Sequence, residues 1–417
     1  MEKTVCELFA GVGGFRLGLE KSDKEWNTVW ANQWEPGRKS QYAFDCYCTH
    51  FGINENHVNK NISDIDKSTI PDHNLLVGGF PCQDYSVART GATGINGKKG
   101  VLWWDIRDIL EAKQPSFVLL ENVDRLLKSP TKQRGRDFGI ILTCFNKLGY
   151  NVEWRIINAA EYGFPQSRRR TFIFAYKNTT VFSDRIEKSF SHPECIFNNV
   201  GFFAHTFKIH SISRNDIQSI QLTETDLASV SERFSYDFDN SGFMHNGTIY
   251  TCKTTPMSEE PILLKDILSR NVNERFFLRD NLDKWKYLKG AKKIERTSKT
   301  GHTYIFSEGP IAFPDSIEKP ARTMLTSESS LNRSTHVIED PETKQLRLIT
   351  PVEAERIQGF DDDWTNTGMP EKFRYFCMGN ALVVGLITRM GNYLNTIFER
   401  EINTNTNVED FQPREVI

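Results

Sequence analysis

Short apolar runs alternate with amphipathic stretches from residue 1 to about residue 180, and this alternation restricts the fold more than any other feature of the chain. Such a pattern is typical of strand–helix units that build a mainly parallel sheet. We therefore predict an open α/β domain. The expected strands are Thr4–Phe9, Thr28–Asn32, Asn74–Gly78, Phe117–Glu121, Val152–Asn158 and Thr171–Tyr176, and the expected helices are Phe15–Glu20, Gln41–Phe51, Trp104–Lys113 and Phe138–Leu148.

The alternation stops near Lys177, where polar segments with isolated aromatic, Gly and Pro residues begin. A helical pattern returns at Thr350–Gln358 after a Thr-Pro start, and Ala381–Phe398 has the periodicity of a long helix with one apolar face. We therefore predict three parts: a first domain over residues 1–184, a second over 185–346, and a segment 347–417 that returns to the first.

The composition is that of an ordinary globular protein. Of the 417 residues, 38% are hydrophobic and 25% are charged, and the net charge of -2 gives no general sign of a nucleic-acid partner, although a basic patch can exist within a neutral average. The chain starts directly with an apolar strand-like stretch, and no apolar run approaches the roughly 20 residues of a membrane span. We expect a cytoplasmic protein.

The eight cysteines are scattered without the paired spacing of a disulfide framework, so we expect reduced thiols. Cys46, Cys48 and His50 are close in sequence and suggest a zinc site, but they fall in a helix-like segment without a second pair of ligands. We favour the interpretation without a metal.

Two segments near the start of the chain have the features of a nucleotide site. The first, Leu8 to Phe15, contains Gly11, Gly13 and Gly14, and such a turn lets the backbone approach a ligand while the following helix offers free N–H groups. Without a ligand, the same glycines would form only a tight turn. The second, Asn32 to Glu35, lies about 20 residues later, where related folds bind a ribose. Its tryptophan and acidic side chain fit a nucleoside as well as they fit plain packing.

Three further segments carry reactive or charged side chains. An apolar strand ends in Gly-Gly and leads into Phe80-Pro81-Cys82, so the Cys82 thiol follows the carboxyl end of a strand, where ligands of open α/β sheets bind. Glu121 ends the next apolar strand, and a carboxylate there is costly unless it is paired or used. In Arg168–Arg170 the alternation of a strand directs the first and third arginine to one face.

Taken in order, these segments resemble the motifs of cytosine carbon-5 DNA methyltransferases, in particular those of bacterial restriction–modification systems. The shared motifs are Phe-Ala-Gly-Val-Gly-Gly-Phe, Gly-Phe-Pro-Cys-Gln, Glu-Asn-Val, Gln-Ser-Arg-Arg-Arg, Leu348 to Phe360, and Met-Gly-Asn-Ala at Met378 to Ala381. The resemblance covers roughly the first 180 and last 70 residues. It implies a Rossmann-like S-adenosylmethionine-dependent domain and a smaller, mixed target-recognition domain over residues 185–346.

The resemblance also implies roles for individual residues. Cys82 is the nucleophile, Glu121 holds the flipped base, Arg168 contacts the base carbonyl, and Arg170 orients Glu121 or the thiolate. The methyl donor, and its product S-adenosylhomocysteine, is then held by Phe9, Ala10, Gly11, Val12, Gly13, Gly14, Gln33, Trp34, Glu35, Asn61, Ile62, Phe80, Pro81, Asn380 and Ala381.

The chain departs from the family at some of these positions. Asn61 stands where many members have an acidic residue that binds the adenine amino group, although its side-chain oxygen can accept the same bond. Asp64-Ile65 is an alternative alignment for Asn61-Ile62. Gln33 replaces a glutamate found in some members, which leaves the ribose contact open.

The function that the resemblance implies is methyl transfer to carbon 5 of a flipped cytosine in a specific duplex sequence, by a monomer of a bacterial or phage-infected cell, with a cognate restriction endonuclease that acts separately. A tRNA cytosine carbon-5 methyltransferase is the alternative, but the long region between the arginine motif and Thr350 favours DNA. An inactive regulatory subunit would not need Cys82, Glu121 and Arg168. An oxidoreductase of the dinucleotide-binding type would leave the Pro-Cys-Gln motif unexplained.

Overall fold

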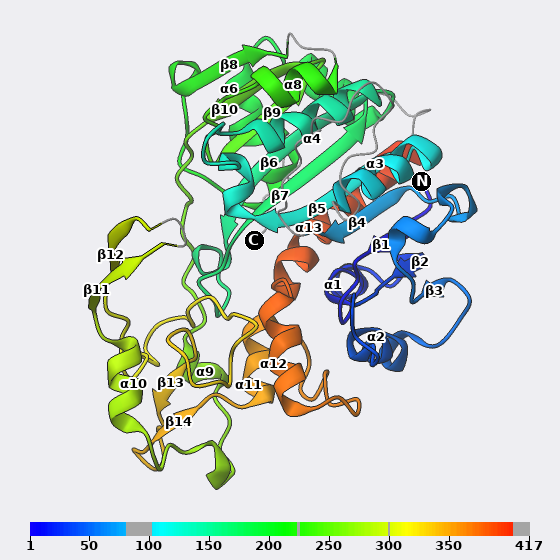
Figure 1. Ribbon diagram of the computed structural model, residues 1–417. Helices are drawn as coiled ribbons and strands as arrows, with labels where there is room; N and C mark the ends of the chain where they lie inside the picture. Colours follow the sequence, from blue (N-terminus) through cyan, green and yellow to red (C-terminus); the bar gives the residue numbers. More distant parts are fainter. Residues whose placement is uncertain (81–101, 223–225, 299–300, 403–417) are drawn as a thin grey trace.

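The computed structural model describes residues 1–80, 102–222, 226–298 and 301–402, and it has a ten-stranded sheet at its centre (Figure 1). The strand order is β3-β2-β1-β4-β5-β7-β6-β9-β10-β8. Pairing is parallel from β3 to β5 and antiparallel from β5 to β8. The strands are β1 (Thr4–Leu8), β2 (Asn27–Asn32), β3 (His57–Val58), β4 (Leu75–Gly79), β5 (Phe117–Val123), β6 (Tyr150–Asn158), β7 (Arg169–Lys177), β8 (Ile217–Gln221), β9 (Ser241–His245) and β10 (Thr248–Cys252).

Helices cover both faces of this sheet, because successive side chains of a strand point to opposite faces and the central strands are apolar on both. In β5, Val118 and Leu120 pack into the core on the side of α3 and α4, whereas Phe117 and Leu119 pack into the core on the side of α1 and α13. The helices are α1 (Gly14–Ser22), α2 (Tyr42–Phe51), α3 (Leu102–Lys113), α4 (Arg136–Lys147), α5 (Val181–Lys188), α6 (Pro193–Cys195), α7 (Phe202–Thr206), α8 (Leu227–Arg233) and α13 (Val384–Ile402).

A smaller region hangs below the sheet in Figure 1, and its short elements pack around a core that they share with α1 and α2. We call residues 257–350 the target region. Its elements, with the two helices that follow it, are α9 (Leu264–Ile267), α10 (Leu282–Lys289), β11 (Lys292–Thr297), β12 (Thr303–Glu308), β13 (Val337–Glu339), β14 (Leu346–Leu348), α11 (Pro351–Gln358) and α12 (Glu371–Asn380).

The expected α/β fold is confirmed, and every expected strand and helix is present with its ends shifted by at most a few residues. The helix expected at Thr350 begins there for a clear reason, since the Thr350 side chain and the Glu353 carboxylate cap each other's backbone N–H groups. The sheet, however, continues past the boundary that we expected at residue 185. Strands β8, β9 and β10 lie beyond it and extend the central sheet from β6.

Figure 1 also shows how the chain closes. Helix α13 returns to the sheet and packs beside α1, where Gly18 makes this close approach feasible: a methyl group on Gly18 would lie 2.5 Å from Ile387 Cβ. Among the described helices we find none with the length and apolar character of a membrane span.

Candidate active site

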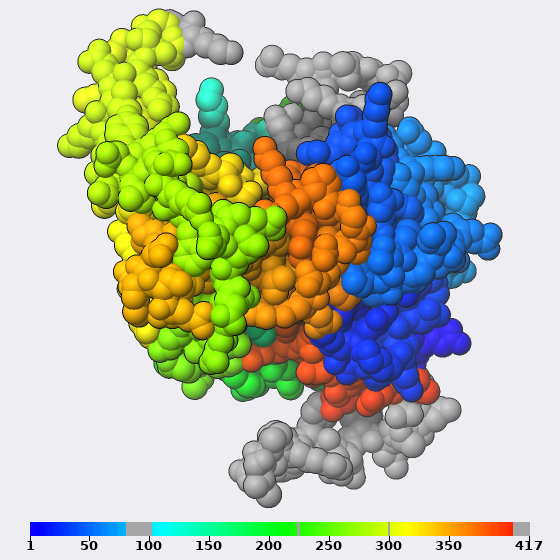
Figure 2. Space-filling model, turned by 90° about the horizontal axis from the view of Figure 1, so that it is seen from below, coloured from blue at the N-terminus to red at the C-terminus, as the bar shows by residue number. Residues whose placement is uncertain are grey.

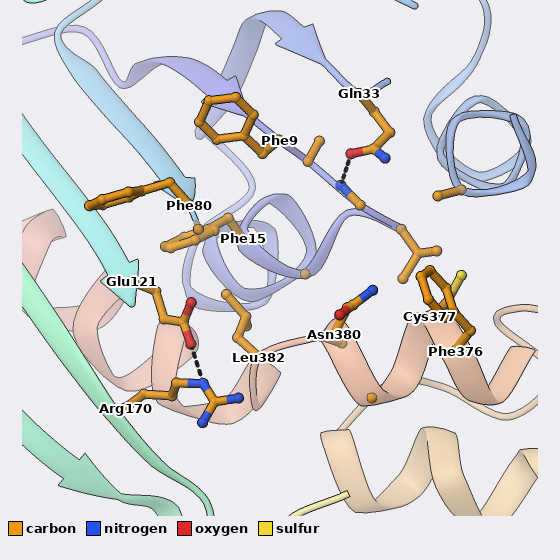
Figure 3. A pocket seen from close by; sticks show the side chains of 18 of the residues that line it. Phe9, Phe15, Gln33, Phe80, Glu121, Arg170, Phe376, Cys377, Asn380 and Leu382 are labelled. Carbon is orange, nitrogen blue, oxygen red and sulfur yellow. Dashed lines mark hydrogen bonds and ion pairs between the residues drawn. The ribbon is translucent and has the colours of Figure 1, made fainter. Parts of the chain in front are cut away.

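A cavity of about 700 Å³ opens at the carboxyl ends of β1, β4 and β5. Segments from both ends of the sequence line it (Figure 3). The lining residues from the predicted site are Phe9, Ala10, Gly11, Val12, Gly14, Gln33, Glu35, Phe80, Glu121, Arg168, Arg170, Asn380 and Ala381. The structure therefore brings most of the predicted residues together in one place.

The glycine turn forms the floor of this cavity. Phe9 and Gly11 both have left-handed backbone, with φ of 54° and 57°, a conformation that is uncommon for a residue with a side chain and clusters at functional sites. A methyl group added to Gly11 would meet no atom within 4 Å, so the space above this residue belongs to the cavity. Gly13 serves packing instead, because it precedes α1 at φ +89° and an added methyl group would lie 2.3 Å from the Phe51 ring.

The side chain of Gln33 bonds directly to this turn. Its Oε1 accepts a hydrogen bond of 2.8 Å from Gly11 N, as the upper dashed line of Figure 3 shows. Glu35 is only 8% exposed, its Oε2 accepts from Ala43 N at 3.4 Å, and burial raises the pKa of this carboxyl. These two side chains supply oxygen atoms on the side of the cavity formed by β2.

Four other predicted cofactor residues do not line the cavity or cannot be placed. Trp34 is 38% exposed and does not line the cavity. Asn61 Oδ1 accepts from Ser63 N at 3.3 Å and so caps a short helical turn, while Ile62 is buried in the core on the α3 side. Pro81 lies outside the described residues.

Glu121 lies at the opposite end of the cavity from Gln33. It is the register partner of Gly79 on β4, and a methyl group on Gly79 would lie 3.1 Å from Glu121 Oε2, so a glycine leaves room for the carboxylate. Arg170 Nε lies 2.7 Å from Glu121 Oε1, and both side chains are largely shielded from solvent. The lower dashed line of Figure 3 marks this ion pair.

Cys82 lies outside the described residues, but the structure describes the chain up to Phe80. Asn122 Nδ2 donates to Phe80 O at 2.8 Å, and Phe80 N donates to Glu121 O at 3.3 Å. Both bonds fix the end of β4 against the end of β5. Phe80, two residues before Cys82 in the sequence, therefore lies directly beside Glu121.

Arg168 bonds to two backbone carbonyls of the protein, and its expected contact with a base carbonyl stays a prediction. Arg168 is 2% exposed, and its guanidinium donates to Met324 O and to Gly379 O, each at 3.0 Å. Burial and the neighbouring Arg170 lower its pKa to about 9. Arg168 thus links β7, the target region and the end of α12, and Arg170 is the arginine that reaches Glu121.

Sequence reasoning did not single out several other lining residues. Phe15 and Phe360 are each the last residue of a motif that we had recognised, but neither was assigned to the site. Phe376, Cys377 and Leu382 come from α12 and its C-terminal end. The return of the chain to the sheet brings them here, and the sequence predicted this return for the segment 347–417 as a whole but not for these three side chains.

A second cavity, of about 580 Å³, lies farther along the same edge of the sheet, beyond β7. Among its lining residues, Lys128, Arg169 and Lys253 are exposed cations. Arg169 is 3.3 Å from Asp124, and Arg134, also in the lining, is 3.0 Å from Asp237. This edge therefore carries a polar hollow next to the one that contains Glu121.

The residues of the zinc alternative serve packing. Cys46 Sγ donates to Trp364 O at 3.4 Å, and the His50 ring stacks on Trp364 with 3.6 Å between centroids. Among the described residues no group of three His, Cys, Asp or Glu side chains could hold a metal ion.

The comparison with known sequences decides the family. The C-5 cytosine-specific DNA methylase family matches residues 3–396, which is nearly the whole chain. The protein belongs to this family.

Relatives of this methylase are similar over different lengths. Type II methyltransferase M.Sau3AI of Staphylococcus aureus is 53% identical over 94% of this chain and 95% of that protein. Type II methyltransferase M.HhaI of Haemophilus parahaemolyticus is 34% identical over 41% of this chain and 48% of that one. Among solved structures, the S. pombe Dnmt2 methyltransferase covers 96% of the chain with a TM-score of 0.56 at 16% identity. At this low identity the likeness supports only the fold.

Proposed function

We propose that the chain transfers a methyl group from S-adenosylmethionine to carbon 5 of a flipped cytosine in a specific duplex DNA sequence, as the modification enzyme of a restriction–modification system. The observation that carries this proposal is the Glu121–Arg170 pair. It lies in the same cavity as the glycine turn and beside the point where the chain leads to Cys82. One cavity therefore offers room for a nucleoside at one end and a carboxyl group for the target base at the other.

The residues present fit S-adenosylmethionine. A turn with two left-handed residues and open space above Gly11 allows close approach of a ligand, and Phe9, Phe15 and Phe376 offer aromatic surfaces beside it. Gln33, Asn380 and Ala381 are the candidates for its polar groups. When bound, this cofactor supplies an electrophilic methyl group. It remains a prediction that binding also involves Trp34, Asn61, Ile62 and Pro81.

The residues of this chain would activate the base. Carbon 5 of cytosine is a weak nucleophile, and addition of the Cys82 thiolate to the neighbouring ring carbon 6 converts it into the nucleophilic end of an enamine. Glu121, when protonated, gives its proton to ring nitrogen 3 as the sulfur–carbon bond forms. Arg170 holds the carboxyl in place. After methylation, a base removes the hydrogen from carbon 5. Ring nitrogen 3 then returns its proton to the Glu121 carboxylate as the carbon–sulfur bond breaks and the thiolate leaves, which restores the neutral aromatic ring.

The target base is accessible only if it leaves the duplex, because stacking hides both ring faces of a paired cytosine. The duplex would then lie along the edge of the sheet that carries both cavities. Lys128, Arg169 and Lys253 on the second cavity are suited to the phosphates of the flanking strand. We further propose that the enzyme acts as a monomer and that a cognate endonuclease cuts DNA separately.

Trapping of the covalent intermediate tests this function. Fluorine at carbon 5 blocks the final elimination, so the wild-type enzyme with S-adenosylmethionine should form a denaturation-resistant adduct with duplex DNA that contains 5-fluorocytosine. Cys82→Ala should form no adduct, and Cys195→Ala, which removes another thiol that is not fully buried, should form as much as wild type. Adduct formation by Cys82→Ala would refute the assignment. Parallel reactions with tRNA test the alternative substrate, and preferential labelling of tRNA would favour it.

A further inference from the structure

Two lining residues of the active-site cavity come from segments that are distant in sequence and lie side by side in the fold. Glu35 belongs to the loop between β2 and α2, and Phe376 belongs to α12. Figure 2 shows that the orange surface around α12 borders the blue surface of the N-terminal part. Tyr42, the first residue of α2, packs on Phe373 of α12 with 5.1 Å between the ring centroids. The two segments that contribute these walls are therefore in contact.

The side chain of Arg38 contacts both segments. Its guanidinium carbon lies 4.9 Å from the centre of the Phe373 ring and 5.1 Å from the centre of the Phe376 ring. These rings are about one helical turn apart and stack with 5.0 Å between their centroids. Within its own loop, Arg38 Nε lies 3.9 Å from Glu35 Oε1. One side chain thus joins a lining carboxylate of the loop to a lining ring of the helix.

The backbone of the loop holds Arg38 in this place. Arg38 N donates to Glu35 O at 3.3 Å across a tight turn. Pro36 and Gly37 are the central residues of this turn, and Gly37 has a φ of 73°, as a type II turn requires. Gln41 secures the turn, because its Nε2 donates to Glu35 O and to Arg38 O, each at 3.0 Å. The turn therefore directs Arg38 back toward Glu35 and α12.

The contacts of Arg38 have a strength that suits a closure which must open again. Its side chain is 47% exposed, and both cation–ring contacts and partly exposed ion pairs are individually weak. Glu35 is buried, and burial raises the pKa of its carboxyl while the Arg38 charge opposes that rise. Arg38 therefore favours the ionised form of Glu35 that pairs with it. Together these contacts can hold two walls in place and still break in each catalytic cycle.

We propose that Arg38 is a positioning residue that clasps the walls at Glu35 and Phe376 together while the cofactor is bound, and so slows the release of S-adenosylmethionine and S-adenosylhomocysteine. This inference rests on the proposed function. Arg38 is not among the described residues that line the cavity, so it acts through Glu35 and Phe376. Contacts that must break before a ligand leaves act mainly on its dissociation rate. Opening of such a closure limits turnover in many enzymes.

The test follows the release of labelled cofactor from the full-length enzyme in the absence of DNA. Each protein is loaded with S-adenosylmethionine that carries tritium in its methyl group. Unlabelled S-adenosylhomocysteine is then added in excess, and filter binding measures the label that remains bound over time. Arg38→Met removes the charge and keeps an apolar side chain over the rings, whereas Arg38→Lys keeps a cation. Melting temperatures show how much stability each variant loses.

Arg389→Met is the matched control. Arg389 of α13 also lies over two phenylalanine rings, at 5.6 Å from Phe164 and 5.8 Å from Phe207. It also pairs with a glutamate, since its Nη1 lies 2.6 Å from Glu259 Oε1. Arg389 is not among the described lining residues of the cavity. The control therefore removes the same kinds of contact from a different part of the molecule.

We expect Arg38→Met to release the label about tenfold faster than wild type, because it loses two cation–ring contacts and an ion pair. Its association rate should stay within about twofold of wild type, because the clasp acts on exit. Arg38→Lys should recover part of the retention, and Arg389→Met should release the label at the wild-type rate.

Release from Arg38→Met at the wild-type rate would overturn the proposal. Equally fast release from Arg389→Met would also overturn it, since lost stability alone would then free the ligand. A slower association with unchanged release would show that Arg38 guides entry and is no clasp. If the wild-type enzyme itself retains no label, cofactor binding and with it the proposed function are refuted, a result that differs from every failure of the Arg38 variants alone.

Discussion

Arg170 Nε lies 2.7 Å from Glu121 Oε1, and the two side chains come from the neighbouring antiparallel strands β7 and β5. Arg170 is opposite Val123 in the register, so the ion pair runs diagonally across the two strands to reach Glu121. The strand pairing itself therefore fixes the position of the carboxyl group that the mechanism needs.

The first prediction concerns this ion pair. Glu121→Gln should lower kcat by about 100-fold or more, because the amide cannot transfer a proton to the base. Arg170→Met should also lower kcat, since the carboxyl loses the group that holds it, and Arg170→Lys should restore part of the activity. Single-turnover methylation measures the effect, with exposed Glu55→Gln as the control. Turnover of Glu121→Gln close to that of wild type would show that another group handles the ring nitrogen.

The second prediction concerns Arg168 as a positioning residue. Arg168→Ala leaves Met324 O and Gly379 O without their buried donor, which should cost on the order of 2 kcal/mol of unfolding free energy. Because Gly379 directly precedes Asn380, the variant should also bind S-adenosylhomocysteine several-fold more weakly in calorimetry. Tyr150→Phe is the control, since it loses a buried bond to Pro115 O far from the cavity and should lower stability alone. Equal affinity in both variants would reduce Arg168 to a structural role.

The third prediction separates the glycines of the turn. Gly11→Val should weaken S-adenosylhomocysteine binding most, because the added side chain enters the open space of the cavity and a β-branched residue is strained at the φ of +57° that this turn requires. Gly13→Ala should instead lower the melting temperature, because its Cβ would overlap Phe51 and the residue needs φ of +89°. Calorimetry and thermal melting give the two readouts. The reverse pattern would mean that the ligand does not lie above Gly11.

The fourth prediction concerns pH and buried Glu7. Burial raises the pKa of this carboxyl to about 7, although Tyr47 Oη donates to it at 2.9 Å. The folded protein therefore holds a proton that the unfolded chain releases near pH 4.5. Glu7 favours the fold fully below that pH, and its contribution falls, by on the order of 1 kcal/mol per pH unit, as the pH rises toward 7.

Glu7→Gln removes this titration. Chemical denaturation between about pH 5 and 8 should thus show a flatter dependence of unfolding free energy on pH for the variant than for wild type. Glu153, whose pKa burial also raises to about 7, remains in both proteins, so the difference between the curves isolates Glu7. Parallel curves would mean that Glu7 is already ionised in the fold at the acidic end of this range.

The sequence predicted those features that a local pattern encodes. The glycine turn and Glu121 follow apolar strands, and the parallel order of these strands brings their ends to one edge. Strand β8 was missed because it is a half-exposed edge strand with the sequence Ile-Gln-Ser-Ile-Gln, which has little apolar signal. Alternation placed Arg168 and Arg170 on one face, but it could not tell which of them turns to Glu121. That depends on Met324 and Gly379, which are distant in sequence.

The cavity walls have a consequence for the order of events in the cell. Phe9 to Phe15 and Phe376 to Leu382 come from opposite ends of the sequence, and α13 must pack beside α1 to bring them together. During translation, the segment Phe9 to Phe15 leaves the ribosome long before the segment Phe376 to Leu382 is synthesised. A nascent chain therefore lacks a complete cavity until α13 has left the exit tunnel, and the proposed methyl transfer to DNA could begin only after that point.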